Sequence, residues 1–231
     1  MLTPAEWAVI GLSLKVSLVA TGLGLPIAFA LAWALARWRF PGRFLLDGVI
    51  HLPLVAPPVV IGWLLLSAFG PAGPIGRLLA DLFGVSLMFR WTGAAVAAGV
   101  MALPLMVRAM RLSIEAVDRR LENAARTLGA SRTRTFWTIS LPLALPGVLA
   151  GVVLGFARSI GEFGATIAFV SNIPGETRTL SLAIYTALQT PGGDGAAMRL
   201  ALFSVGLSLV ALAVSEYLTR RSHRQEARDV V

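Results

Sequence analysis

The chain has 231 residues, of which 56% are hydrophobic and only 14% are charged. Soluble globular domains carry about 25% charged residues, so this composition excludes an ordinary soluble domain and indicates a membrane protein. Cysteine is absent, which excludes disulfide bonds, iron–sulfur clusters and thiolate zinc sites. The net charge of +8 comes almost wholly from arginines that are not gathered on one soluble face, so we expect no nucleic-acid binding.

Five stretches are apolar enough to cross a bilayer, whose hydrocarbon core needs roughly 20 helical residues. They cover residues 16–36, about 44–70, about 91–107, about 141–157 and about 200–215. Lys15, just before the first stretch, could reach lipid headgroups or face the bundle interior. Glycines and a proline interrupt residues 159–190, which could re-enter the membrane or form a sixth, irregular span; we favour a short, gate-like helix. The predicted fold class is therefore all-α: one polytopic transmembrane bundle over residues 1–231, with about five spans plus that helix.

The arginines predict the orientation of these spans. Residues 37–43 hold three arginines, residues 108–134 hold seven and residues 220–228 hold four, and with five spans all fourteen lie on one side. The other side holds only Arg77, Arg90, Arg178 and Arg199. Because positive charges are retained on the cytoplasmic side, we expect the N-terminus outside and the C-terminus in the cytoplasm. No basic residue precedes Lys15, so we expect the first span to be retained rather than cleaved as a signal peptide.

The chain lacks the motifs of an energy-converting or catalytic protein. Its sole lysine lies outside any G-x-x-x-x-G-K-[ST] sequence, so no P-loop is present to bind ATP. Its two histidines, His51 and His223, are too far apart for a plausible metal site. The loops between spans are too short for an independently folded domain. We therefore expect no catalytic residues, no metal and no cofactor, and any energy source must be another polypeptide.

The polar segment 118–140, between the third and fourth spans, is predicted to be a cytoplasmic loop with a helix, a glycine stop and a second helix capped by Ser131. Ala124, Ala125 and Leu128 lie at helical spacing beside Glu122 and Asn123, and Gly129 follows. Small side chains let a helix sink into a groove on a partner, whereas a solvated linker helix is the simpler interpretation. We favour docking of a partner at Glu122, Asn123, Ala124, Ala125, Leu128 and Gly129.

Two other segments are candidates for a pathway. Pro53, Pro57 and Pro58 must kink the second span, as helices that line cavities often do, although a kinked packing helix is an equal alternative. Arg158 and Glu162 could neutralise each other at i,i+4. The hydroxyls and glycines around them suit brief hydrogen bonding to an oxyanion, and Arg178 could attract it. The pathway and gate candidates are Ser159, Gly161, Glu162, Gly164, Thr166 and Arg178.

These segments together resemble the membrane subunits of ABC importers, most closely those for molybdate. The resemblance rests on the His51–Gly62 run, Leu105–Ala109, the alanine–glycine segment around residue 125 and above all Phe169–Thr179. In that family the polar loop is a coupling helix that begins with Glu-Ala-Ala and docks on the ATPase; here Asn123 occupies the Glu position and Glu122 precedes it. The resemblance implies a type I importer permease in the bacterial cytoplasmic membrane, surrounded by lipid. It also implies a homodimer, two ATPase subunits, and a periplasmic or extracellular molybdate-binding protein.

Alternatives from other classes remain open. A membrane-embedded enzyme would show clustered acidic or histidine residues at one depth, and a passive channel would not need the alanine–glycine loop. Co-purification with a separate ATPase would distinguish both from an importer. Within the importer class, sulfate (or thiosulfate) and tungstate are the rival substrates, since sulfate permeases share the Gly-Glu-Phe-Gly element found here at residues 161–164.

Overall fold

The computed structural model describes residues 2–228, without the side chains of Leu212, Ser215, Glu216 and residues 218–228. The four arginines at residues 220–228, which were predicted to be cytoplasmic, therefore lie outside the described side chains. The elements are helices: α1 (Pro4–Arg37), α2 (Arg43–Val55), α3 (Pro58–Phe69), α4 (Pro74–Phe83), α5 (Trp91–Ala116), α6 (Arg119–Thr127), α7 (Arg132–Thr135), a π-helical turn η1 (Phe136–Ser140), α8 (Leu141–Ile160), α9 (Gly164–Val170), α10 (Leu180–Leu188) and α11 (Asp194–Arg228).

Among the described residues, α1, α5, the continuous α7–η1–α8 helix and α11 are each long and apolar enough to cross a membrane. The α2–α3 pair makes a fifth span if its two helices count as one. The all-α bundle agrees with the prediction, and the predicted number of about five spans is reached when the bent α2–α3 pair is counted as one. The first span, predicted to begin at residue 16, belongs to a helix that begins at Pro4, where Thr3 and Glu6 form a capping box.

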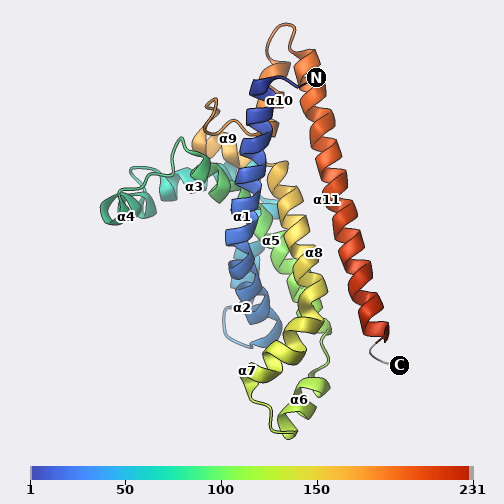
Figure 1. Cartoon of the computed structure of the whole chain (residues 1–231). Helices are drawn as coiled ribbons and strands as arrows, with labels where there is room; N and C mark the ends of the chain where they lie inside the picture. The colour runs from blue at the N-terminus through green and yellow to red at the C-terminus, as the bar shows by residue number, and fades with distance from the viewer. Residues whose placement is uncertain (1, 229–231) are drawn as a thin grey trace.

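Helix α5 is the centre of the bundle and packs between α1 and α8 (Figure 1). The first half of its buried face is largely alanine, including Ala94, Ala97 and Ala102 with essentially no exposed surface. Small side chains let helices approach closely in a membrane, where packing rather than water expulsion drives association. At one end of α5, the Lys15 Nζ lies 3.7 Å from the centre of the Trp91 ring. The charge of Lys15 is therefore directed to an aromatic face on the neighbouring helix.

The predicted second span is broken rather than merely kinked. Helices α2 and α3 meet at an angle of 119° across a break of two residues. Pro57 and Pro58 occupy the N-cap and first position of α3, where they cannot donate the backbone hydrogen bonds that would continue α2. Pro53, by contrast, is accommodated inside α2. The predicted bend is found at Pro57 and Pro58 but not at Pro53, and α3 consequently turns away from the direction of α2.

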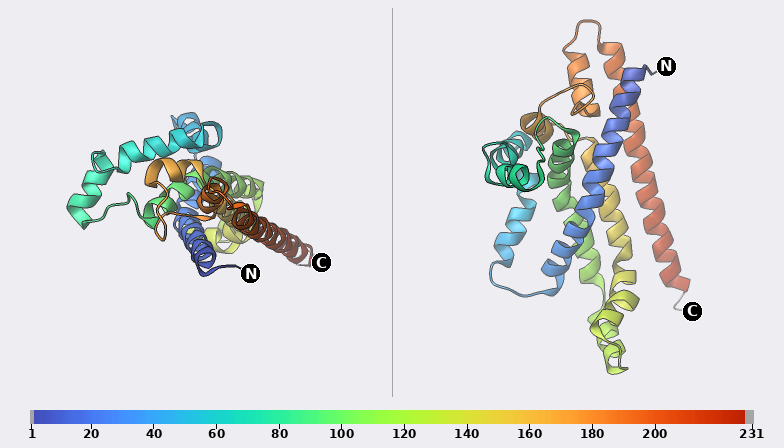
Figure 2. Two further views of the ribbon diagram at one scale, coloured as in Figure 1. Left: turned by 90° about the horizontal axis from the view of Figure 1, so that it is seen from above. Right: turned by 60° about the vertical axis from the view of Figure 1, so that its left-hand side comes forward.

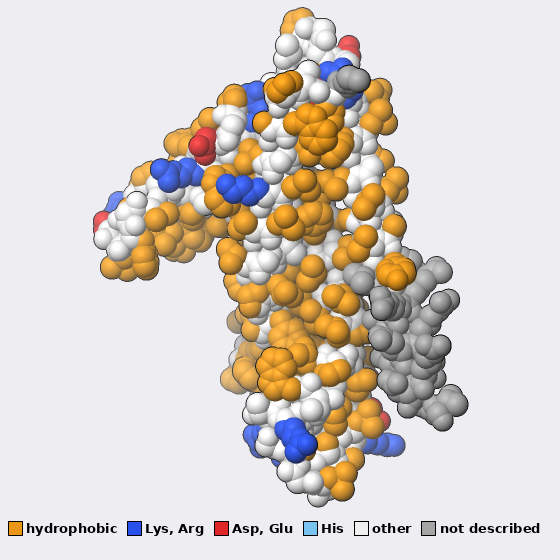
Figure 3. Space-filling model, viewed as in Figure 1, with side chains coloured by type: hydrophobic (Ala, Val, Ile, Leu, Met, Phe, Trp, Pro, Cys, Tyr) orange, Lys and Arg blue, Asp and Glu red, His pale blue; other side chains and the backbone are white. Residues whose placement is uncertain are grey.

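Helices α3 and α4 form an arm that projects sideways from the bundle (Figure 2). On α4 the exposed side chains of Ile75, Leu78 and Leu82 lie on one face, and Arg77 and Asp81 lie on the other. Figure 3 shows hydrophobic side chains along one side of this arm and charged ones along the opposite side. This pattern is typical of a helix lying at the boundary between apolar and aqueous surroundings.

The two ends of the bundle carry different elements. Helices α6 and α7 lie at one end, and α10 lies at the other, near the start of α1 (Figure 1). In place of one gate-like helix, residues 159–190 contain two short helices, α9 with 7 residues and α10 with 9. Neither reaches the length of a membrane span. Short helices in this region agree with the preferred prediction.

Candidate functional site

The polar segment after α5 folds locally as the sequence predicted. The Asp118 carboxylate accepts a hydrogen bond from the backbone N–H of Arg120 and caps α6. Gly129 ends this helix with a φ of +89°, a backbone conformation that glycine adopts without strain. The Ser131 hydroxyl then accepts a hydrogen bond from the N–H of Arg134 at 3.2 Å and caps α7. Helix, glycine stop and second capped helix are thus all present.

One face of α6 is apolar and exposed. The side chain of Leu128 is 89% exposed, that of Leu121 is 50% exposed, and Ala124 lies exposed between them. Ala125 is half-buried and Asn123 is exposed. Leu121 was missed in the sequence, although it lies three and seven residues before Ala124 and Leu128, which is the spacing of one helical face. At the end of an otherwise polar segment, such a face is suited to contact another protein.

Glu122 is directed away from this face and toward the bundle. Its Oε1 atom lies 2.7 Å from the Nη2 atom of Arg37, at the end of α1, and accepts a hydrogen bond of 2.7 Å from the hydroxyl of Ser140 in η1. One carboxylate oxygen therefore joins α6 to two other elements. Arg37 and Ser140 were not among the predicted site residues, because no local pattern relates positions 85 and 18 residues away from Glu122.

The broken span meets the predicted gate segment directly. A Cβ atom added to Gly62 of α3 would lie 2.6 Å from the carbonyl oxygen of Ala165 in α9. One added to Gly164 would lie 2.7 Å from the Cβ of Pro58. Both distances are shorter than van der Waals contact, so neither position has room for a side chain. The backbones of α3 and α9 approach each other closely because these two residues are glycines. Two candidate elements far apart in the sequence are thus placed against each other.

The carboxylate of Glu162 organises the junction between α8 and α9. Glu162 is only 2% exposed, and its Oε2 atom forms an ion pair of 2.7 Å with Nη1 of Arg158. Its Oε1 atom accepts a hydrogen bond of 2.8 Å from the N–H of Ala165, in the first turn of α9. The predicted pairing of Arg158 with Glu162 is confirmed. A buried carboxylate that is paired and hydrogen-bonded in this way positions α9 against α8.

The other pathway candidates separate into two groups. Ser159 and Thr166 are buried near this junction, the Ser159 hydroxyl without a partner among the described residues, and Gly161 caps the end of α8. Arg178 lies instead in the loop before α10, where its Nε atom donates a hydrogen bond of 2.9 Å to Oδ1 of Asn172. The same loop is braced by Thr177, which is fully buried and hydrogen-bonds to Ser171 and Ile173.

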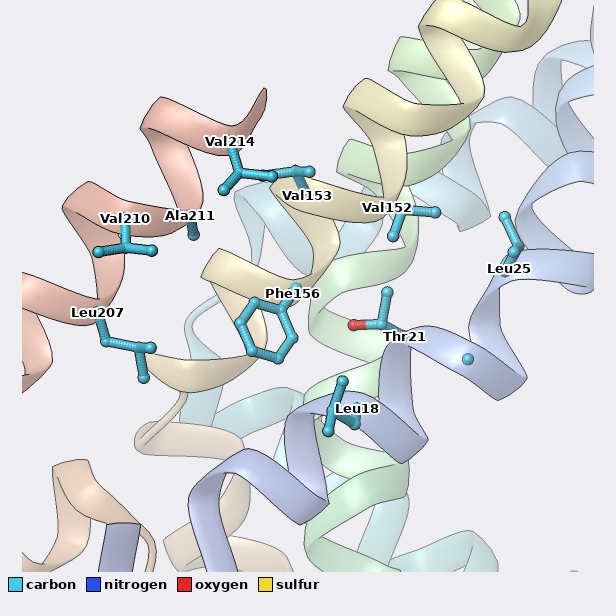
Figure 4. A pocket seen from close by; sticks show the side chains of 11 residues that line it. Leu18, Thr21, Leu25, Val152, Val153, Phe156, Leu207, Val210, Ala211 and Val214 are labelled. Atoms are coloured by element: carbon cyan, nitrogen blue, oxygen red, sulfur yellow. The ribbon is translucent and has the colours of Figure 1, made fainter. Parts of the chain in front are cut away.

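Two cavities of the single chain that adjoin α1 are apolar. One of about 400 Å³ lies between α1, α8 and α11 and is lined almost entirely by aliphatic side chains and Phe156, with Thr21 as its polar group (Figure 4). A second, of about 470 Å³, lies between α1 and α5 and is also mainly apolar. Neither offers the donors that an oxyanion needs. Among the side chains that the structure describes, no three from His, Cys, Asp or Glu gather in a way that could hold a metal ion.

Residues 24–224 match the protein family described as "Binding-protein-dependent transport system inner membrane component". The chain belongs to this family. As an inner membrane component it is a multi-pass transport subunit, as the sequence resemblance implied. It is 57% identical over 228 residues to the molybdenum transport system permease protein ModB of Escherichia coli (strain K12), covering 99% of this chain and 100% of that protein.

Two further relatives differ in their named substrate. The putative molybdenum permease YvgM of Bacillus subtilis (strain 168) is 42% identical over 180 residues, covering 78% of this chain and 79% of that protein. The sulfate transport system permease protein CysT of Salmonella typhimurium is 42% identical over 159 residues, covering 69% of this chain and 57% of that protein.

Solved structures share the fold of this inner membrane component. A chain of the bacterial alginate ABC transporter, in complex with a pentasaccharide-bound periplasmic protein, matches with a TM-score of 0.74 at 18% identity, over 95% of this chain and 80% of that one. A chain of the MetNI methionine ABC transporter, in an inward-facing conformation, matches with a TM-score of 0.71 at 16% identity, over 96% and 99%. The predicted importer-permease fold is confirmed.

Proposed function

We propose that the chain is the membrane subunit of an ABC importer and translocates molybdate. The observation that carries this proposal is the 57% identity, over nearly the whole of both chains, to the molybdenum permease of Escherichia coli. The likeness to the sulfate permease covers only 69% of this chain and is lower in identity. Sulfate and tungstate are therefore the competitors that a test must include.

The energy for transport would come from a separate ATPase that binds α6. The exposed face of Leu121, Ala124 and Leu128 supports this role, because an apolar helix face at the tip of a polar segment can enter a groove of a partner. Glu122 supports it further, because its bonds to Arg37 and Ser140 connect the docked helix to α1 and to the start of α8. In a dimer of this chain, two such helices would bind two ATPase subunits.

The membrane pathway would lie between two copies of the chain. An oxyanion needs polar partners, and the two apolar cavities of the single chain provide almost none. The α3–α9 contact and the α8–α9 junction bring short helical elements together at a place where such a pathway could be closed. We assign the gate to Ser159, Gly161, Glu162, Gly164 and Thr166 on this basis.

The arginine distribution supports an orientation with α6 in the cytoplasm and α10 outside. A periplasmic or extracellular binding protein would then deliver molybdate at the end that carries α10. Arg178 is on this side and, although bonded to Asn172, keeps its positive charge to attract an anion or an acidic patch. Replacing Arg178 by Glu is expected to lower uptake while leaving basal ATP hydrolysis unchanged; normal uptake would remove this role.

Reconstitution tests the function directly. The chain, with the ATPase and binding protein of the same organism, is placed in proteoliposomes, and ATP-dependent uptake of molybdate, tungstate and sulfate is compared at equal concentrations. We expect uptake of molybdate that sulfate in excess does not suppress. Uptake of sulfate with none of molybdate would overturn the substrate, and uptake without the ATPase would identify a channel instead.

The docking face has its own test. Leu128→Gln is expected to weaken co-purification of the ATPase. The exposed Leu128 side chain would be buried by the ATPase in the complex, and a polar side chain would not bind well in the same place. Arg119→Gln is the matched control, since Arg119 is exposed on the opposite side of the same helix. Equal retention of the ATPase by both variants would contradict docking through this face.

A further inference from the structure

A polar cavity lies between α2 and α5, away from the segments assigned above. Its volume is about 330 Å³, and it is lined by Asp47, His51, Arg108, Arg111, Leu112 and Glu115. The four residues from α5 follow the spacing of one helix face, and the two from α2 are one turn apart. Charged side chains from two helices therefore converge on one space, in contrast to the apolar cavities next to α1.

Most of the charged groups in this cavity are held in place by one another. Nη1 of Arg111 lies 3.1 and 3.2 Å from the two carboxylate oxygens of Asp47, and its Nε lies 2.8 Å from Oε1 of Glu115. Nδ1 of His51 lies 2.9 Å from the backbone oxygen of Asp47. The imidazole is thus oriented through Nδ1, and no described residue bonds to its Nε2 atom. These contacts form a fixed frame.

Arg108 differs from the other charged residues that line the cavity. It lines the same cavity but forms no ion pair or side-chain hydrogen bond with any described residue, and it is exposed. A guanidinium presents several N–H donors in a plane that matches two oxygens of a tetrahedral oxyanion. The unpaired guanidinium of Arg108 therefore supplies the donors that a small anion would use.

The balance of charge suits brief binding of a dianion. Arg43 lies 3.9 Å from Glu115, so the three arginines Arg43, Arg108 and Arg111 face the two carboxylates of Asp47 and Glu115 and exceed them by one positive charge. The carboxylates keep Arg111 from acting as a second free cation. A site on a transport pathway must bind well enough to admit its ligand and weakly enough to release it. A single excess charge meets that requirement better than a cluster of unpaired arginines.

The position of the cavity along α5 indicates on which side of the membrane it lies. Arg108 is the first charged residue after the uncharged run 91–107 of α5. It lies in the C-terminal half of that helix, which leads to α6. We propose that this α2–α5 pocket is a transient binding site for a tetrahedral oxyanion dianion at the cytoplasmic exit of the pathway. The proposal rests on the proposed import function for its direction, but the binding site itself can be tested without transport.

The absence of cysteine allows a direct binding assay on the assembled complex. Leu112 lines the pocket and is 61% exposed, so Leu112→Cys provides a reporter that is not a proposed ligand. The variant complex, without nucleotide and in nanodiscs of zwitterionic lipid, is treated with an anionic thiosulfonate reagent. Molybdate is expected to slow the reaction about threefold at twice its dissociation constant, and chloride at equal ionic strength is not.

Second substitutions separate the pocket from general effects of charge. Protection here means that molybdate slows the reaction of the introduced thiol. It should be lost in the double variant Leu112→Cys, Arg108→Gln and largely retained in the double variant Leu112→Cys, Arg108→Lys. It should persist with Arg90→Gln, which removes an exposed arginine at the other end of α5. In proteoliposomes Arg108→Gln should reduce the maximal uptake rate without lowering ATPase binding.

The outcomes distinguish this proposal from the proposed function. If the native complex imports molybdate but the anion gives no protection, or gives it equally with Arg108→Gln, the pocket is not a binding site. If added anionic phospholipid protects and molybdate does not, the pocket binds lipid phosphate and the proposal is wrong. If the native complex imports no molybdate at all while protection depends on Arg108, the binding site stands and the proposed function fails.

Discussion

The bond between Arg37 and Glu122 makes a quantitative prediction about how α6 is attached. The two side chains are 10% and 19% exposed, and the same carboxylate oxygen also accepts the Ser140 hydroxyl. Removing one member of a mostly buried pair leaves the other charge without compensation, which costs about 3 kcal/mol. At about 2–4 °C per kcal/mol for a chain of this size, Glu122→Ala should lower the Tm by about 6–12 °C.

Thermal unfolding of the purified protein in one detergent provides the measurement. Arg37→Met should show a similar loss, and the double variant should lose clearly less than the sum of the two, since the coupling energy of a charged hydrogen bond is about 1.5–3 kcal/mol. Arg39→Ala is the control, because Arg39 is exposed and should shift stability by less than about 0.5 kcal/mol. Additive losses in the double variant would refute a direct bond between these two residues.

Three other predictions concern packing, backbone and topology. Gly62→Ala should lower the Tm, because the new Cβ would overlap α9 at a cost of about 1–3 kcal/mol, whereas Gly48→Ala meets open space and should not. Gly129→Val should leave the protein inserted but abolish co-purification of the ATPase, since a φ of +89° excludes a β-branched residue; Gly129→Asn should be tolerated. Cysteines at Thr133 and Ala72 should react with an impermeant reagent from opposite sides of the membrane, and labelling of both from outside would overturn the orientation.

Local features of the structure could be predicted from the sequence because they depend on neighbouring residues. The helix that ends at Gly129, the cap at Ser131 and the break at Pro57 and Pro58 all follow from backbone conformation and missing donors. The Arg158–Glu162 pair also follows, from i,i+4 spacing.

Contacts between distant segments could not be predicted in the same way. Nothing in the sequence relates Arg37 to Glu122 or Gly62 to Ala165, because these contacts depend on how the helices cross. The size of the bend at Pro57 was equally beyond the sequence, since a proline sets where a helix breaks and the surrounding helices set the angle. For this reason the sequence could not show which pathway candidates lie together. In the structure Arg178 lies in the loop before α10, apart from the other candidates at the α8–α9 junction.

The uninterrupted helix from Arg132 to Ile160 has a mechanical consequence. It begins directly after Ser131, its N-cap, and ends two residues before Glu162, the residue that positions α9. At 1.5 Å per residue the 20 residues of α8 beyond Ser140 span about 30 Å, so a tilt of about 5° about Ser140 displaces Ile160 by about 3 Å. We take the π-helical turn near the start of this helix as the fulcrum, because Ser140 is hydrogen-bonded there to Glu122. If α6 docks on the ATPase as proposed, a small rotation of α6 would thus be passed on, without any loop to absorb it, as a displacement of about the width of a water molecule.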